Sequence, residues 1–380
     1  MTARLDGRRA PGATRPMTRR EALGLLVGAA AAFPLVGAMP GGVARATDDG
    51  TGPAFTWEPI ERNPVVLSRG STSAYVRMFP TLLPMGYLVP DAIDAWYLWA
   101  WHHHSHPKIR LWTAPSPEGP FTEQPPFVGP PAPGLPPNYD ATHFSSGDIV
   151  WDAARSRLVA SPHSLRLDPH SNGEPCQDSF LLESRDGVDW RFLDGDNSPR
   201  LVCGPPRSFD SVHTGYGRLL RDLDGHLATY QGRYWWLYRA QRHDAGQGAP
   251  TYFVPALASA ESLAGPWTKH GKAYDMAQQS TALFGLGSFV RAGARHHVYY
   301  AEGSAALAPT VQYLNGSEGD DMVWNGPGVP VPIPNSGETG VTAGGGNLVR
   351  DPWTGVQYLV QDGTLPMGGS EIRIYRSVAS

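Results

Sequence analysis

A four-strand pattern recurs five times along this chain and constrains the fold more than any other feature. A strand marked by Gly or Ser comes first, then an aromatic strand, a hairpin, a third strand, and in most units a turn phrase that introduces a fourth. The aromatic strands and their partners are 96–101 with 109–114, 157–163 with 178–184, 234–239 with 252–260, 297–301 with 311–314, and 356–360 with 371–376. Repetition of four-stranded units is typical of a β-propeller.

The fifth unit has no fourth strand after residue 376, and residues 55–58 and 64–67 near the N-terminus could supply one. We therefore predict an all-β protein with a single β-propeller of five blades, closed by the N-terminal strand. Seven shorter blades are the alternative, if some units each hold more than one blade. A β-sandwich is the third choice.

Residues 1–46 have the organisation of an export signal. Arg19-Arg20 precedes an apolar run over residues 22–38, and Ala44-Arg45-Ala46 is a small-x-small cleavage site. The paired arginines favour a twin-arginine-type signal over an ordinary secretory signal. We expect residues 47–380 to form the catalytic propeller domain, secreted, periplasmic or at the cell surface.

The chain beyond residue 46 is acidic, which argues against two classes of partner. The whole sequence has 31 basic and 35 acidic side chains. Seven of the basic and two of the acidic ones lie in the signal, which leaves 24 basic and 33 acidic groups and a net charge of −9. Such a chain has no general footprint for nucleic acid or for a membrane surface. Its 12 Trp and 15 Tyr suit aromatic strands that fill a core or line a sugar site. The two cysteines, Cys176 and Cys203, could pair or remain free.

Histidine, tyrosine and arginine side chains recur near the first strands of successive units, where the loops of a propeller surround its channel. They are His102, His103, His104, His143, His163, His213, Tyr216, Arg218, Arg295, His296 and His297. A neutral His or a Tyr can take a proton next to a carboxylate, and Arg with a second His can neutralise the developing enolate. Consecutive histidines on an extended backbone alternate faces, so His103 and its two neighbours cannot all point to one site.

Two other uses of these side chains remain open. The His-x-His spacings at His102/His104 and His104/His106 could bind a divalent metal with His143 or Asp148, although such a site needs three well-placed ligands. We expect no cofactor, and a divalent metal is the weaker alternative. Paired carboxylates for glycoside hydrolysis are the other use, with Asp148 on a first strand. Possible second carboxylates are Asp140, Glu183, Asp210, Glu302 and Glu338.

Several phrases resemble carbohydrate-active propeller enzymes. Tyr97-Leu-Trp-Ala-Trp101 and Ser262-Leu-Ala-Gly-Pro-Trp267 look like blade signatures of five-bladed glycosidases of the arabinanase and xylosidase type. A second resemblance is to propeller polysaccharide lyases, the ulvan lyases and the rhamnose–glucuronate lyases. It covers about residues 94–240 and rests on three phrases, which are His103-His104 ahead of Ile109-Arg110-Leu111, His143-Phe-Ser-Ser-Gly-Asp148 and Gly215-Tyr216-Gly-Arg218.

The chain departs from both groups. Those lyases are described as seven-bladed, whereas five units are counted here, and residues 124–140 lengthen the interval between the two His phrases. The carboxylate triad of the glycosidases needs an acid on the first inner strand. Residues 74–80 contain none, and this favours the resemblance to the lyases.

The lyase resemblance implies that His103, His143, Tyr216 and Arg218 are catalytic. His103 or His104 with His143 would neutralise and orient a uronate, Tyr216 or one of these histidines would act as base and acid, and Arg218 would hold the carboxylate. The residues expected to bind substrate are His104, Arg110, Asp148, His163, Trp101, Trp112 and Tyr139.

We therefore predict an exported polysaccharide-degrading enzyme, a lyase that cleaves a uronate-containing glycan by β-elimination. The alternative is a glycoside hydrolase of the five-bladed arabinanase and xylosidase type that uses Asp148 and a second carboxylate. A non-catalytic glycan-binding propeller is the third interpretation. The expected partner is a carbohydrate polymer or oligosaccharide, with no nucleic acid and no membrane once the signal is removed.

Overall fold

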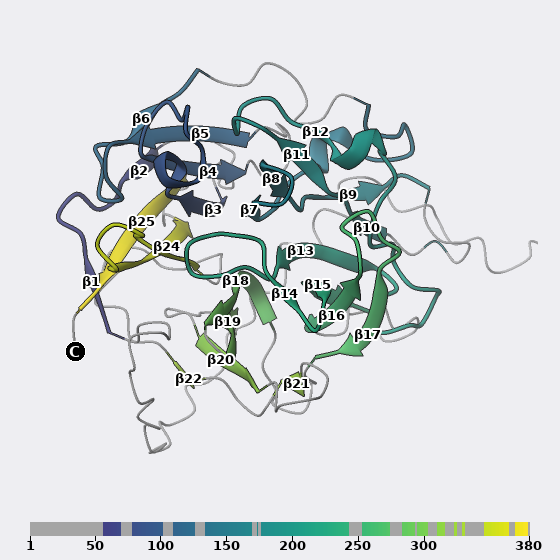
Figure 1. Cartoon of the computed structure of the whole chain (residues 1–380). Helices are drawn as coiled ribbons and strands as arrows, with labels where there is room; N and C mark the ends of the chain where they lie inside the picture. Colours follow the sequence, from purple (N-terminus) through teal and green to yellow (C-terminus); the bar gives the residue numbers. More distant parts are fainter. Residues whose placement is uncertain are drawn as a thin grey trace, which may run out of the picture. The chain divides into compact units, whose positions relative to one another are not determined.

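Five sheets, one for each repeated unit of the sequence, make up the computed structural model of the chain (Figure 1). The structure describes residues 56–69, 78–101, 109–125, 134–168, 173, 176–242, 253–273, 283–292, 295–302, 310–315, 323–324, 329–330, 346–364 and 369–378. The expected export signal over residues 1–46 lies outside them. Within these ranges no helix is long and apolar enough to cross a membrane.

The first three sheets follow the chain in order. The first contains β3 (Met78–Leu83), β4 (Trp96–Trp101), β5 (Ile109–Ala114) and β6 (Thr122–Glu123). The second contains β7 (Ile149–Asp152), β8 (Arg157–Ala160), β11 (Leu182–Ser184) and β12 (Arg191–Phe192). The third contains β13 (His213–Leu219), β14 (Thr229–Tyr230), β15 (Arg233–Gln241), β16 (Val254–Ala260) and β17 (Thr268–Lys272), and the hairpin of β9 (His163–Arg166) and β10 (Cys176–Ser179) joins it beside β13.

The last two sheets complete the set. The fourth contains β18 (Leu283–Ala292), β19 (Arg295–Glu302), β20 (Thr310–Asn315), β21 (Val323–Trp324) and β22 (Val329–Pro330). The fifth contains β23 (Asn347–Arg350), β24 (Gln357–Thr364), β25 (Gly369–Ser377), β1 (Trp57–Pro59) and β2 (Val66–Arg69). In the part of the chain that the structure describes, one single-turn helix, α2 (Met85–Leu88), and two 3₁₀ turns, η1 (Ala141–His143) and η2 (Leu193–Gly195), lie in the connections.

The predicted strand pairs are present in all five units. β4 pairs with β5 over its whole length, with Trp99 opposite Leu111. The strands nearest the N-terminus, β1 and β2, both pair antiparallel with β25, with Trp57 opposite Ser377. β3 covers Met78–Leu83 and pairs opposite Tyr97–Trp101, so it extends beyond the first inner strand expected over residues 74–80.

The hairpin of β9 and β10 was not predicted. Sequence analysis joined residues 157–163 and 178–184 as one pair, but the structure divides it into β8 with β11 and β9 with β10. β10 also runs parallel to β13, with Gln177 opposite His213. The hairpin therefore carries side chains of the second unit to the first strand of the third.

The first strands of the five sheets surround a channel, and each contributes one polar side chain at an equivalent position. We refer to Thr81, Asp148, Arg218, Ser288 and Asn347 as the channel ring. All five are buried. Hydrogen bonds of these side chains link each sheet to the next. Thr81 Oγ1 donates to Asp148 Oδ1 (3.4 Å), and Arg218 donates through Nη1 to Ser146 O (3.4 Å) and through Nε to Gly287 O (2.6 Å). Ser288 Oγ accepts from Leu348 N (2.8 Å), and Asn347 Oδ1 accepts from Leu82 N (3.1 Å).

A left-handed backbone residue precedes the channel ring in three of these strands. Phe79, Ser146 and Tyr216 have φ angles of 57°, 61° and 57°. β3 and β13 each bulge at this point, and β18 bulges ahead of Ser288. A non-glycine residue in this conformation costs on the order of 1 kcal/mol or more, so it persists where the surrounding contacts hold it. The bulge lies two residues ahead of the channel ring in β3 and β13.

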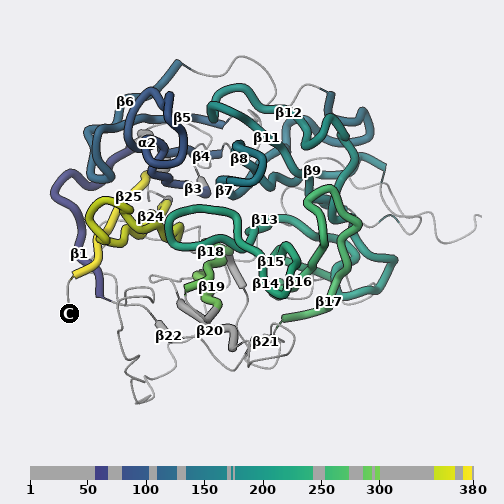
Figure 2. The backbone as a smooth tube through the Cα atoms, viewed as in Figure 1, coloured from purple at the N-terminus to yellow at the C-terminus, as the bar shows by residue number. Residues whose placement is uncertain are grey.

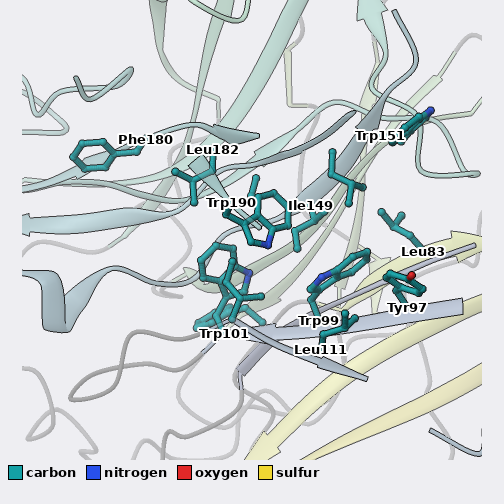
Figure 3. Close-up of a cluster of buried hydrophobic side chains, with 14 of the residues drawn as sticks. Leu83, Tyr97, Trp99, Trp101, Leu111, Ile149, Trp151, Phe180, Leu182 and Trp190 are labelled. Carbon is teal, nitrogen blue, oxygen red and sulfur yellow. The ribbon is translucent and has the colours of Figure 1, made fainter. Parts of the chain in front are cut away.

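Aromatic side chains fill the space between the first and second sheets (Figure 3). Trp99 and Trp101 of β4 are buried in one cluster with Ile149, Leu182 and Trp190. Trp99 Nε1 donates to the Gly187 carbonyl at 3.0 Å, so its polar atom is satisfied inside the core. Burial of such side chains contributes about 25 cal/mol per Å² of apolar surface removed from water.

The two ends of the channel differ. At the mouth, the N-terminal end of the first strands, β13 begins with His213 and η1 ends at His143. At the lower end, the connection over residues 220–228 that follows β13 makes main-chain bonds to three other sheets, through Trp151, Phe289 and Arg350. Figure 2 shows this connection reaching from β13 toward β24. The lower end is thus bridged by backbone.

A disulfide joins Cys176 of β10 to Cys203, 27 residues further on, with a Cα–Cα distance of 6.1 Å. We predict that replacing both cysteines by serine lowers the free energy of unfolding by about 3–4 kcal/mol, because the unfolded chain regains loop freedom. Urea denaturation of protein from an oxidising compartment measures this. A reducing agent should weaken the wild type to the same extent and leave the double variant unchanged. Equal stability of wild type and variant would show that the bridge does not contribute.

Candidate functional site

Five polar or ionisable side chains meet at the mouth of the channel. We refer to them as the histidine cluster, which comprises His143, His163, His213, Tyr216 and Arg239. They come from η1, from β9, from β13 and from β15, so the second and third units both contribute. Each exposes less than a tenth of its surface. Four of the five, His143, His163, His213 and Tyr216, were candidates from the sequence, and all but His213 were assigned a catalytic or binding role.

The rings of the cluster pack on one another around Tyr216. The His163 ring centroid lies 4.7 Å from that of Tyr216 and 5.3 Å from that of His143. His213 stacks on Tyr216 at 5.3 Å with 17° between the planes. The Arg239 guanidinium carbon lies 3.6 Å from the centre of the Tyr216 ring, a cation–π contact. The left-handed backbone at Tyr216 is therefore accompanied by ring contacts with His163, His213 and Arg239.

His213 is a buried imidazole with contacts at both ring nitrogens. Its Nδ1 lies 2.8 Å from the Arg239 carbonyl, and its Nε2 faces Arg239 Nη2 at 3.4 Å. Gly215 N donates to Nδ1 at 2.9 Å. Burial, followed by the nearby Arg239 charge, lowers the pKa of His213 well below its usual value. The ring is therefore neutral at neutral pH.

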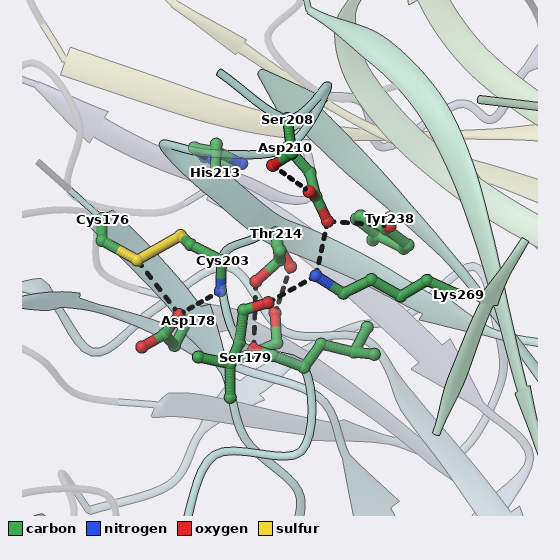
Figure 4. A network of polar contacts seen from close by, with 12 residues as sticks. Cys176, Asp178, Ser179, Cys203, Ser208, Asp210, His213, Thr214, Tyr238 and Lys269 are labelled. Atoms are coloured by element: carbon green, nitrogen blue, oxygen red, sulfur yellow. Dashed lines mark hydrogen bonds and ion pairs between the residues drawn. A yellow bond between two sulfur atoms is a disulfide. The ribbon is translucent and has the colours of Figure 1, made fainter. Parts of the chain in front are cut away.

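The hairpin that carries His163 is fixed by one buried carboxylate (Figure 4). Asp178 Oδ1 accepts from Cys203 N at 2.7 Å, and Oδ2 accepts from Tyr139 Oη at 2.6 Å and from Arg166 Nε at 2.9 Å. Burial, followed by the charge of Asp178, raises the pKa of Tyr139. The Tyr139 hydroxyl is thus engaged inside this support, and its expected role in substrate binding stays a prediction.

A second layer lies below the cluster, where Asp148 meets two arginines. Burial raises the pKa of Asp148, although the charges of Arg221 and Arg218 oppose the shift. Arg218 Nε and Nη1 donate to the carbonyls of Gly287 (2.6 Å) and Gly217 (3.0 Å). Main-chain carbonyls of the channel engage its guanidinium, and the role of Arg218 in holding a substrate carboxylate stays a prediction. Asp148 likewise belongs to the channel ring.

Asp362 of β24 is a second carboxylate of this layer. Its Oδ2 accepts from the Phe79 N–H at 3.1 Å, and its side chain is buried. Burial lowers the pKa of Arg218, while Asp148 and Asp362 oppose that shift. Two carboxylates therefore flank one guanidinium inside the channel.

Three other residues predicted to bind substrate lie elsewhere. Trp101 is fully buried, and its ring fills the space where a side chain at Gly147 would lie. Trp112 is buried between the first and fifth sheets, and Arg110 forms an ion pair with Glu123 on the neighbouring outer strand. Nothing in these contacts supports a role in substrate binding for the three side chains, and that role stays a prediction. His103 and His104 lie outside the described residues.

His213 was among the candidates from the sequence but was given no role, whereas Arg239 and Arg221 were not predicted as site residues. Arg239 stands at the end of an aromatic strand, and its place in the site depends on pairing with Gly215 across a bulged register. Arg221 lies in the connection after β13, where nothing in the sequence distinguishes it from a surface residue. The sequence signal that could have indicated Arg239 is the Tyr238-Arg239 phrase, which lies at the same strand end as the other candidates.

Among the described residues, two groups of side chains have the spacing of a metal site, and both are outside the histidine cluster. Cys176, Asp178 and Cys203 form one, but the cysteines are joined in the disulfide. Asp222, Asp224 and His226 form the other, at the lower end of the channel. Neither group supports the metal site that the His-x-His spacings suggested.

Solved structures of carbohydrate-active enzymes share this fold. One is a thermostable family-43 glycoside hydrolase, with a TM-score of 0.51 and 10% identity over 80% of this chain and 90% of that one. Another belongs to the GH130 family of mannoside phosphorylases, which contains glycoside hydrolases that target β-1,2 mannosidic linkages in Candida mannan, with a TM-score of 0.55 and 13% identity over 85% and 94%.

A third similar structure is an N-acetylgalactosamine deacetylase from F. plautii in complex with blood group B trisaccharide. Its TM-score is 0.53, with 11% identity over 86% of this chain and 94% of that one. No protein-family model and no curated protein matches the chain. Likeness at this identity establishes the all-β, five-bladed propeller fold. The seven-bladed alternative is wrong.

The pKa shifts give a direct test of the cluster's electrostatics. We predict that the His213 ring stays neutral well below pH 6.5, whereas His226, hydrogen-bonded to Asp222, keeps its proton above pH 6.5. NMR titration of ring carbons, assigned with His→Gln variants, measures both. His213 then stabilises the folded state above pH 6.5 and loses this contribution as the pH falls, while the contribution of His226 is lost as the pH rises through its folded pKa. Titration of His213 near 6.5 would contradict its buried, neutral state.

Proposed function

We propose that this protein is a carbohydrate-active enzyme that cleaves glycosidic bonds, acting at the mouth of the propeller channel. The observation that carries the proposal is the histidine cluster, in which ionisable groups from the third sheet and from η1 converge above a pair of buried carboxylates. The fold supports it, because enzymes that act on carbohydrates share the five-bladed architecture. Export by a twin-arginine-type signal would bring such an enzyme to polysaccharides outside the cytoplasm.

Hydrolysis is the first reaction type, because similar structures include glycoside hydrolases. It needs one carboxyl that donates a proton to the leaving oxygen and a second that activates water or attacks the sugar. Asp148 has the property of the donor, since burial raises its pKa. Asp362, on the other side of Arg218, is the second carboxylate of the channel. In this proposal the histidine cluster binds the sugar hydroxyls above them.

β-Elimination is the second candidate, and the composition of the histidine cluster favours it. A neutral His213, or Tyr216, would remove the proton at C5 of a uronate, while Arg239 would stabilise the negative charge that develops on the carboxylate. The bond between C4 and its oxygen then breaks, a proton passes to the leaving oxygen, and an unsaturated uronate remains. This candidate keeps His143 and Tyr216, which the lyase resemblance implied to be catalytic, and His163, which was expected to bind substrate.

The product identifies the reaction. We predict that the mature protein releases reducing ends from a neutral polysaccharide in a panel of arabinan, xylan and mannan, with no rise in absorbance near 235 nm. The reason is that hydrolysis adds water and creates no double bond. The same panel should include uronate-containing polysaccharides as the matched comparison. A rise near 235 nm on those, without turnover of the neutral polymers, would overturn hydrolysis in favour of elimination.

Variants separate the two layers of the site. We predict that Asp148→Asn lowers kcat by about 10³-fold, as expected for loss of a proton donor, and that Tyr216→Phe, which keeps the ring contacts, costs about tenfold. Thermal unfolding checks that both variants fold. The wild-type pH profile is an independent measurement, since activity that needs protonated Asp148 must fall as the pH rises through its pKa. A larger loss from Tyr216→Phe than from Asp148→Asn would contradict the assignment.

A further inference from the structure

Three connections from different sheets meet at the lower end of the channel, opposite the histidine cluster. α2 follows β3 and carries Tyr87, the connection after β13 carries His226, and the turn after β23 carries Trp353. The Tyr87 ring lies 6.0 Å from that of Trp353 and 6.1 Å from that of His226. Figure 2 shows the three connections on one face, near β3, β13 and β24.

The rings of Tyr87 and Trp353 are exposed, whereas a neighbouring tryptophan ring is buried. Tyr87 and Trp353 are 51% and 54% exposed, whereas Trp96, which lies 6.1 Å from Trp353, is 1% exposed. Single exposed aromatic residues are common and need no explanation. Two adjacent rings in edge-to-face contact, each half exposed, form a platform of the kind that marks binding surfaces.

The backbone around both rings is well ordered by hydrogen bonds. Asp351 Oδ1 accepts from Trp353 N at 3.0 Å, and the Asp351 carbonyl accepts from Gly355 N at 2.8 Å. On the other side, Gly86 N donates to Ala95 O at 2.9 Å. Rings presented on fixed turns lose little freedom when a ligand binds, so more of the contact energy appears as affinity.

Planar polar groups lie beside the platform. Arg350 Nε and Nη2 each donate to one oxygen of Asp224 at 2.8 Å, and Asp222 Oδ2 lies 3.3 Å from His226 Nδ1. The pKa of His226 is raised by its hydrogen bond to Asp222. Asp224 is thus paired with Arg350, and Asp222 with His226, so the polar groups beside the rings are partnered by one another. A ligand with an apolar face and uncharged hydroxyl groups fits this mixture.

We propose that Tyr87 and Trp353 form a second carbohydrate-binding surface, which holds an uncharged glycan chain at the lower end of the channel, away from the site of reaction. The proposal rests on the proposed function for the class of its ligand. The sugar's C–H face packs on the rings, and its hydroxyl groups bond to the Asp224–Arg350 pair. Such a surface would keep the enzyme on a polymer between cleavage events and would have no effect on short substrates.

Affinity electrophoresis in gels containing arabinan, xylan or mannan tests the surface. We predict that at least one polymer retards the wild type and Tyr216→Phe, that Trp353→Ala binds about tenfold more weakly, and that Trp353→Phe recovers part of the loss. Trp353→Ala should keep the wild-type kcat on a short oligosaccharide and the wild-type unfolding temperature, because its ring is outside the core.

Two results would overturn the surface. One is retardation of Trp353→Ala equal to that of the wild type, and the other is no retardation of the wild type by any polymer. Retention that depends on Trp353 without any cleavage of the polymers would support the surface while contradicting the proposed function, so the two proposals fail separately.

Discussion

Two buried guanidinium groups, those of Arg218 and Arg221, hold the centre of the molecule together. Arg218 bonds to carbonyls of the second, third and fourth units, and Arg221 Nη2 donates to the Leu348 carbonyl of the fifth at 2.8 Å. A buried charge without a partner destabilises a fold by several kcal/mol, so these contacts and the carboxylate of Asp148 are required once the arginines are inside. The five first strands can be arranged around them in few ways.

This constraint also shapes the mouth of the channel. The bulge that turns Arg218 inward leaves Tyr216 in a left-handed conformation, between His163, His213 and Arg239. The equivalent bulge ahead of Thr81 contains Phe79, whose ring lies 5.0 Å from that of Tyr216. Backbone strain, a buried cation and a proton acceptor therefore occur together, which is typical of a functional site. The hairpin of β9 and β10, which Asp178 fixes, adds His163 to this group.

Much of the fold could be predicted from the sequence, because aromatic strands such as Trp96–Trp101 show their pairing by composition and by the turns between them. The bulges could not, since Phe79, Ser146 and Tyr216 are ordinary residues in strand-like surroundings. The same limit explains the site predictions. His143, His163 and Tyr216 were found because residue type alone suggests their chemistry, whereas Trp101 and Trp112 were misplaced because a core ring and a sugar platform have the same composition.

The platform of Tyr87 and Trp353 illustrates this point from the other direction. The sequence suggested that tryptophans of β4 and β5 contact sugars, but those rings fill the core, while Trp353 in a short turn is exposed. Exposure depends on how α2 and the turn after β23 meet, a property of the assembled propeller. The position of a residue in the folded propeller, rather than its type, therefore distinguishes the structural aromatic and charged residues from the candidate functional ones.

We propose that carbohydrate is bound and cleaved at the mouth of the channel. A crystal structure of the Tyr216→Phe variant soaked with an oligosaccharide from whichever polymer is cleaved would test this most directly. We predict a sugar ring in contact with His163 and residue 216, with its scissile bond directed toward Asp148. Sugar found only at a site remote from the histidine cluster would contradict it.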